Sequence, residues 1–144
     1  MSKAVQSNTQ VGDIRLVAGV ELSGLEGRLV KVANASGKAV GALPVADTDL
    51  TPYVLVEGGA SGANVSVRPL EPGRNVRLVL LGECAPGDVL VLADTSVEAD
   101  RGKVRALPAD AGTYRGLAVA EETGVEGQWV LARPAAVGAI VVTE

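Results

Sequence analysis

Short runs of alternating apolar and polar residues, separated by turn-forming residues, follow one another after the first dozen positions. In the first run, Ile14, Leu16 and Ala18 point to one side and the residues between them to the other, which is the period of a strand. Strands are predicted in this way over residues 14–18, 29–33, 38–43, 53–56, 63–68, 75–81, 89–93, 103–107, 113–120, 128–133 and 139–142. Helix is poorly supported, and the best candidate is one turn over residues 46–50, capped by Asp47 or Thr48. The pattern therefore predicts an all-β protein.

The predicted strands fall into two similar sets. Residues 87–93 (GDVLVLA) open the clearer set, and residues 27–33 (GRLVKVA) open its echo. The alignment continues with 14–17 against 76–79, 37–44 against 102–108, 53–56 against 114–119, and 62–69 against 127–134. This recurrence indicates an internal duplication. A unit of roughly 60 residues would be marginally stable alone, so we predict one β domain over residues 13–144. It is a small β-barrel or sandwich of two pseudo-symmetric repeats, over about 13–71 and 72–144.

The connections between the predicted strands carry further expectations. The loop over residues 94–102 is longer and more acidic than its counterpart at 34–37, and insertions of this kind go to the surface. The Arg-Pro pairs at 68–69 and 133–134 most simply mark strand ends.

A polar segment precedes the first strand. Residues 1–10 show no periodicity and contain neither glycine nor proline. We expect residues 1–12 to form a flexible N-terminal arm, and two interpretations of it remain open. It is either a disordered tail or an arm that becomes ordered on a partner.

The composition narrows the core and the class of partner. Hydrophobic residues make up 47% of the chain and aromatic residues only 2%, so valine, leucine and alanine must build the core. The net charge is −4 and no basic stripe exists, which argues against nucleic-acid binding. The longest apolar run, residues 135–142, is too short to span a bilayer, and the N-terminus lacks the apolar core of a signal peptide. A single cysteine, Cys84, suits a protein made in a reducing cytoplasm.

Groups that usually carry catalysis are missing or isolated. The chain contains no histidine, so it lacks the usual general base and the commonest metal ligand. Without an imidazole to activate it, Cys84 is expected to be a small buried or turn-packed residue. The paired carboxylates at 121–122 and at 47 and 49 have neither the geometry of an acid–base pair nor that of a calcium loop. We therefore predict no catalytic, cofactor-binding or metal-binding residues, and no enzyme.

Trp129 is the only tryptophan and stands where the first repeat has Asn64. It is either an interface residue, because an indole brings a large contact area at little entropy cost, or a side chain that caps the core. The candidate partner-contacting residues are Val5, Gln6, Asn8, Gln10, Val11 and Trp129.

Several segments of the second repeat resemble a known family. These are residues 87–91 (GDVLV), 102–104 (GKV), 114–122 (YRGLAVAEE) and 130–133 (VLAR). They are similar to the second half of the capsid cement proteins, or head decoration proteins, of tailed phages, and the first repeat resembles the weaker first half of that family. The resemblance spans about residues 12–142. Departures are the acidic loop over 94–102 and Gly-Leu-Ala where an aromatic residue often follows the glycine.

The resemblance implies a compact β-barrel on the outer capsid surface of a virion, made in the host cytoplasm. It implies a non-enzymatic structural protein that binds the major capsid protein and stabilises the shell, is oligomeric, and has no catalytic residues to carry over. A trimer would suit a three-fold position on the capsid. The alternative is a small β-barrel binding or carrier module, in which Lys38 or Lys103, each following a turn glycine, would carry the attached group. Neither class requires a membrane or a nucleic acid.

Overall fold

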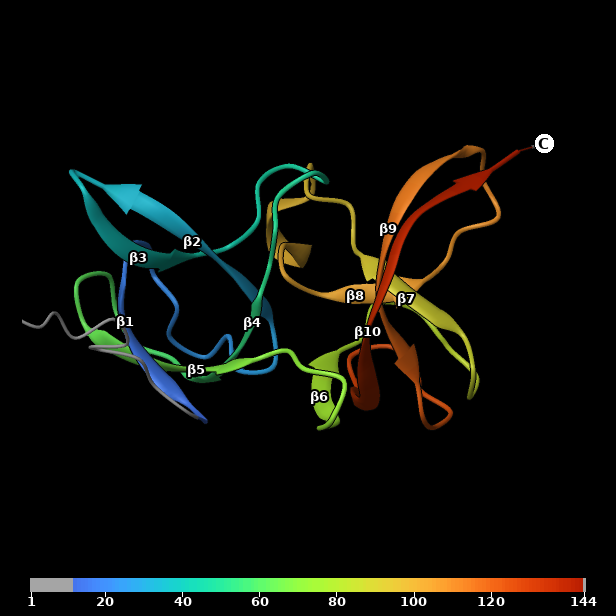
Figure 1. Ribbon diagram of the computed structural model, residues 1–144, viewed down its shortest axis with the longest axis horizontal. Coiled ribbons are helices and arrows are strands. Elements are labelled where there is room, and N and C mark those ends of the chain that lie inside the picture. Colours follow the sequence, from blue (N-terminus) through green and yellow to red (C-terminus); the bar gives the residue numbers. More distant parts are fainter. Residues whose placement is uncertain (1–11, 144) are drawn as a thin grey trace, which may run out of the picture.

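The computed structural model describes residues 12–143 and places them in ten β-strands and one short 3-10 helix (Figure 1). The elements are β1 (Ile14–Ala18), β2 (Leu29–Ala35), β3 (Lys38–Ala42), β4 (Tyr53–Glu57), β5 (Asn64–Pro69), β6 (Val76–Val79), β7 (Val89–Leu92), η1 (Glu98–Asp100), β8 (Val104–Ala106), β9 (Gly112–Ala120) and β10 (Trp129–Val142). The predicted all-β fold class is confirmed. Across residues 12–143, no helix is both long and apolar enough to cross a bilayer.

Strands β1–β5 form a closed barrel in the order β1-β3-β2-β4-β5, on the left of Figure 1. Strand β1 closes it by pairing in parallel with β3 and antiparallel with β5. The β2–β3 hairpin turns at Ser36 and Gly37, whose φ angles of 53° and 87° place both in the left-handed region that tight hairpin turns require. The interior is aliphatic, as the composition predicts, and its buried members are Ala18, Leu22, Val30, Leu55, Val65 and Val67.

Strands β6–β10 form a five-stranded sheet in the order β6-β10-β9-β7-β8. An isolated parallel bridge between Leu80 and Val104 brings the end of β6 beside β8. This bridge stands where β1 pairs in parallel with β3 in the first unit. The two units therefore contain the same set of strand pairings, and the second unit completes its circle through a single bridge.

Individual backbone hydrogen bonds also recur between the units. The Gly27 N–H donates to the Leu55 carbonyl at 2.9 Å, and the Gly87 N–H donates to the Ala120 carbonyl at 2.8 Å. Further matching pairs are Leu22 to Gly59 with Cys84 to Gly124, and Gly62 to Ala18 with Gly127 to Leu80. Leu55 thus corresponds to Ala120, which makes the predicted alignment of residues 53–56 with 114–119 wrong in register. Tyr53 corresponds to Ala118 and not to Tyr114.

The second unit differs from the first by an extension of two strands. Strands β9 and β10 have 9 and 14 residues, whereas β4 and β5 have 5 and 6. The additional residues, 112–116 and 138–142, pair with each other beyond a bulge between Pro134 and Gly138. We refer to these two segments as the terminal ribbon. In Figure 1 it extends away from the barrel toward the C-terminus.

The extension corrects two predictions about β10. The strands expected over residues 128–133 and 139–142 are one bulged strand. The Arg-Pro pair at 133–134 therefore lies inside a strand, at the bulge, where a proline without an N–H is tolerated. The pair at 68–69 does end its strand, β5, as predicted.

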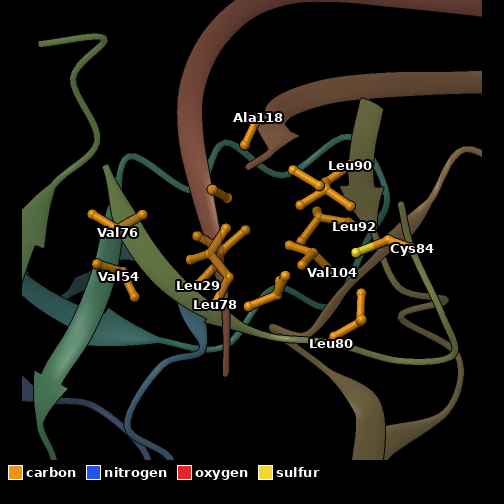
Figure 2. Packing of buried hydrophobic residues seen from close by; sticks show 13 residues of the cluster. Leu29, Val54, Val76, Leu78, Leu80, Cys84, Leu90, Leu92, Val104 and Ala118 are labelled. Atoms are coloured by element: carbon orange, nitrogen blue, oxygen red, sulfur yellow. The ribbon is translucent and has the colours of Figure 1, made fainter. Parts of the chain in front are cut away.

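The two units share a hydrophobic core. Leu29 and Val54, from the first unit, belong to the cluster that fills the second. Figure 2 shows Leu29 beside Leu78 and Val54 beside Val76. Hydrogen bonds cross the same boundary, from the Val79 N–H to the Gly27 carbonyl at 3.0 Å and from the Leu29 N–H to the Gly102 carbonyl at 2.8 Å.

The loop over residues 94–102 also packs on the first unit. The Arg28 guanidinium donates through Nη1 to the carbonyl oxygens of Ala99 and Arg101, at 2.9 and 3.0 Å. Thr95 is buried and donates its hydroxyl hydrogen to Asp47 at 2.9 Å. The expectation of a surface loop is therefore wrong for its buried positions, although Glu98 and Ala99 of its 3-10 turn, η1, are exposed.

The helical turn predicted over residues 46–50 does not form a helix. The segment makes a turn in which the Asp49 carboxylate accepts hydrogen bonds from the N–H groups of Val45 and Ala46, at 2.8 and 3.1 Å. Lys31 also binds this carboxylate at 3.0 Å. Asp49 therefore holds the turn, in place of the expected cap residues Asp47 or Thr48.

Shortening Leu29 tests whether the two units unfold together. Leu29→Ala should lower the free energy of unfolding by about 2–5 kcal/mol, because a fully buried leucine leaves a cavity. Urea unfolding followed by Trp129 fluorescence and by far-UV circular dichroism should give one coincident transition. Val56→Ala, at an exposed position of β4, is the control and should change stability by less than about 1 kcal/mol. Two separate transitions would show that the shared core does not couple the units.

Candidate partner-binding surface

Trp129 lies where the two units meet. Its strand position is paired with Val79 of β6, and 48% of the residue is exposed. A methyl group placed on Gly27 would lie 3.4 Å from the indole atoms Cδ2 and Cε2, so the ring lies against the backbone of the first unit. Trp129 therefore covers part of the junction and also presents a large apolar surface to solvent, which leaves both sequence interpretations open.

A groove of about 410 Å³ runs beside the indole. Its lining residues come from both units and from the connection between them, and they are Gly27, Val54, Leu55, Val56, Arg68, Arg74, Asn75, Val76, Arg77, Trp129 and Leu131. The groove thus combines an aliphatic floor with guanidinium and amide groups. That combination suits an extended polypeptide segment, whose apolar side chains and backbone carbonyls need both kinds of contact.

An ion pair and a hydrogen bond fix Arg77 beside the start of β10. Arg77 donates through Nη1 to the Trp129 carbonyl at 2.9 Å and to Glu122 at 3.0 Å. The carboxylate of Glu122 also accepts the Leu131 N–H at 3.0 Å. The hydrogen bond from Leu131, followed by that from Arg77, holds the pKa of Glu122 below its ordinary value of 4.5. This network holds the first residues of β10, Trp129 included, in a defined position.

The start of the described chain is attached to the same groove. Arg68, one of its lining residues, binds both carboxylate oxygens of Asp13, at 2.7 and 3.0 Å. The hydrogen bond from Arg68 is the largest of the effects that hold the pKa of Asp13 below its ordinary value of 3.8. The first described residues, which follow the predicted arm over residues 1–12, therefore lie close to the groove. The candidate contacts in that arm, Val5, Gln6, Asn8, Gln10 and Val11, lie outside the described residues.

The side chains considered for catalysis are buried or bound to neighbouring side chains. Cys84 is buried in the shared core, as predicted, and burial raises the pKa of its thiol. Glu121 binds Arg133 at 3.2 Å and Asn75 at 3.0 Å, a separate set of partners from those of Glu122. Within residues 12–143, no three cysteine or carboxylate side chains gather as a metal site.

The two lysines considered for a carrier role differ in their surroundings. Lys103 binds Asp100 at 2.9 Å, and both side chains are largely covered. Lys38 is exposed at the first residue of β3, next to the hairpin turn. A tethered Lys103 does not fit a mobile attachment point.

The sequence singles out Trp129 as a candidate contact but does not predict the groove beside it. Arg74, Asn75 and Arg77 follow the short connection between the repeats and carry no motif. Only their location could indicate a binding role, because a junction between two packed units is a common place for a binding groove. Their location at the junction is known only once the three-dimensional arrangement of the surrounding strands is known.

Replacing Asp13 tests the attachment of the chain start. Asp13→Asn should reduce the free energy of unfolding at about pH 7 by less than about 1 kcal/mol, because the ion pair is partly exposed. A lowered folded-state pKa gives stability that is present above the ordinary value of 3.8 and is lost as the pH falls through the lower one. The difference from the wild type should therefore disappear in acid, measured by urea unfolding at several pH values. Asp110→Asn, at an exposed position, is the control, and a difference that persists in acid would contradict this assignment.

The fold is similar to that of a solved phage protein. No protein-family model and no curated protein sequence matches the chain. Among solved structures, a match is the crystal structure of the head fiber gp8.5 N base in bacteriophage phi29, with a TM-score of 0.64 and 17% sequence identity. The alignment covers 88% of this chain and 95% of the phage chain. The chain therefore has the fold of a phage head fiber base over nearly the full length of both proteins.

Proposed function

We propose that this chain is a non-enzymatic structural protein of a phage virion, a cement or decoration protein that binds the outer capsid surface and stabilises it. The observation that carries the proposal is the fold similarity to the phi29 head fiber base, which extends over 88% of this chain. The second-repeat segments that resemble tailed-phage cement proteins support it independently. Two of the groups considered for catalysis have structural roles, because Glu121 binds Arg133 and Cys84 is buried in the shared core.

The partner in this proposal is the major capsid protein. An exposed tryptophan beside a mixed apolar and basic groove is a typical anchor for a protein partner. Asp13 binds Arg68 at the edge of that groove, and we expect the arm that precedes Asp13 to act on the same neighbouring subunit as the groove. A homotrimer at a three-fold position of the shell remains our proposal for the assembly. The carrier alternative predicts a mass adduct on Lys38, which intact-mass spectrometry would detect.

Deletion of the arm tests its part in attachment. A variant without residues 2–10 should keep the melting temperature of the isolated protein, because no described strand is lost. It should occupy purified particles less fully than the full chain, because an arm ordered on a neighbour adds hydrogen bonds and contact area. Occupancy is measured by quantitative electrophoresis of washed particles. Equal occupancy would show that the arm is a tail with no part in binding.

Truncation of the indole tests the groove. Trp129→Ala should reduce particle occupancy at limiting protein concentration by a factor of about ten or more, since interface tryptophans often contribute over 1–2 kcal/mol. Val20→Ala, at another exposed apolar position, is the matched control and should bind as the wild type does. Both variants should melt within a few degrees of the wild type. An unchanged occupancy of Trp129→Ala would remove the groove from the binding surface.

Addition of the protein to bare particles tests the cement role itself. A ligand that binds only the assembled shell must stabilise it, by about 2.7 kcal/mol per site at a hundredfold excess over Kd. Particles should therefore withstand a higher temperature before they release their contents, measured by the fluorescence of a nucleic-acid dye. Unchanged particle stability at full occupancy would contradict the cement function and leave simple decoration.

A further inference from the structure

The terminal ribbon, residues 112–116 and 138–142, has two unpaired edges. Strand β7 pairs with β9 only from Gly116 onward, and β6 pairs with β10 only over residues 129–132. Among the described residues, neither outer edge of the ribbon is hydrogen-bonded to another strand. A two-stranded ribbon alone is marginally stable in water, and a free apolar edge is a template for a further strand.

The two faces of the ribbon differ. Tyr114 and Ile140 are cross-strand partners on one face, which turns toward the body of the second unit, where Arg105 lies 5.9 Å from the tyrosine ring. The opposite face carries Thr113, Arg115, Ala139 and Val141, all of which are exposed. Val141, a valine in the last strand, is 68% exposed. Among the described residues, the apolar side chains of Ala139 and Val141 on this outward face are therefore left exposed to solvent.

An apolar hollow of about 440 Å³ lies beside that outward face. Its lining residues are Leu50, Thr51, Pro52, Leu70, Pro72, Arg115, Gly116, Leu117, Pro134, Ala135 and Gly138. Leu50 on its rim is 67% exposed, and with Val141 it is one of the two most exposed large hydrophobic residues among those described. A projecting apolar ribbon and an apolar hollow thus occupy adjoining parts of one surface.

We propose that a second copy of this chain docks here, with the ribbon of one copy against the hollow of its neighbour. This contact would be the interface of the homo-oligomer proposed above. The proposal does not depend on capsid binding. Charge favours a copy of the same chain over an oppositely charged partner. Arg115 is the only charged residue of the ribbon and hollow, whereas the whole chain carries a net charge of −4. Neither the ribbon nor the lining of the hollow carries a carboxylate that would repel a second acidic chain, and each copy supplies both the projection and the hollow.

Charged substitutions on the two sides of the contact test the proposal. Sedimentation velocity of the full chain over a range of concentrations should show self-association of the wild type. Val141→Asp and Leu50→Asp should each raise the dissociation constant by about tenfold or more, because each places a charge where an apolar side chain is buried. Val125→Asp, at an exposed apolar position away from the ribbon, is the matched control and should associate as the wild type does. Circular dichroism should show the same fold for all three variants.

Cysteine substitutions test the geometry of the contact. The only native cysteine is buried, so Leu50→Cys and Val141→Cys chains carry one accessible thiol each. Mixed under mild oxidation, the two variants should form a disulfide-linked pair of unlike chains. A wild type that stays monomeric at all concentrations, a control as impaired as the two variants, or association without this cross-link would overturn the proposal. If monomeric chains lose particle occupancy through Val141→Asp, the surface belongs to the capsid protein, and the proposed function stands without this inference.

Discussion

The insertion of Leu29 and Val54 from the barrel into the core of the second unit is the contact on which the rest of the molecule depends. With aromatic residues at 2% of the chain, the core consists of small aliphatic side chains, and each unit has few large groups to bury. Sharing a core removes more apolar surface from water than either unit could remove alone. The same contact fixes the junction, and with it the Trp129 groove, whose lining comes from both units.

The strand content could be predicted because alternation, glycine and proline act locally. The β2–β3 turn is an example, since its conformation is set by adjacent residues. The register of β9 could not be predicted in this way. The match of Tyr53 with Tyr114 rests on residue identity, whereas the hydrogen bonds equate Leu55 with Ala120. The packing of Arg28 on residues 99 and 101 joins positions about 70 apart in the chain, and no local pattern encodes it.

The candidate site could likewise be predicted from the sequence only in part. Trp129 could be found because it is unique and replaces a polar residue of the first repeat. Asn75 and Arg77 line the groove only because the two units pack together. Glu121 and Glu122, which lie between β9 and β10, bind these two side chains. The bulge at residues 134–138 was equally hidden, because the proline that suggests a strand end also fits an irregular position within a longer strand.

The bulge in β10 has an evolutionary consequence. It separates the part of the strand that completes the aliphatic core from the part that forms the ribbon. Substitutions beyond the bulge can change the surface of the ribbon without opening a cavity in the core, so selection for folding and selection for recognition act on different residues of one strand. The barrel of the first unit has no such division, because its short β4 and β5 both serve its closure. Related chains should therefore diverge fastest over residues 138–142 while the preceding half of the strand keeps its small apolar residues.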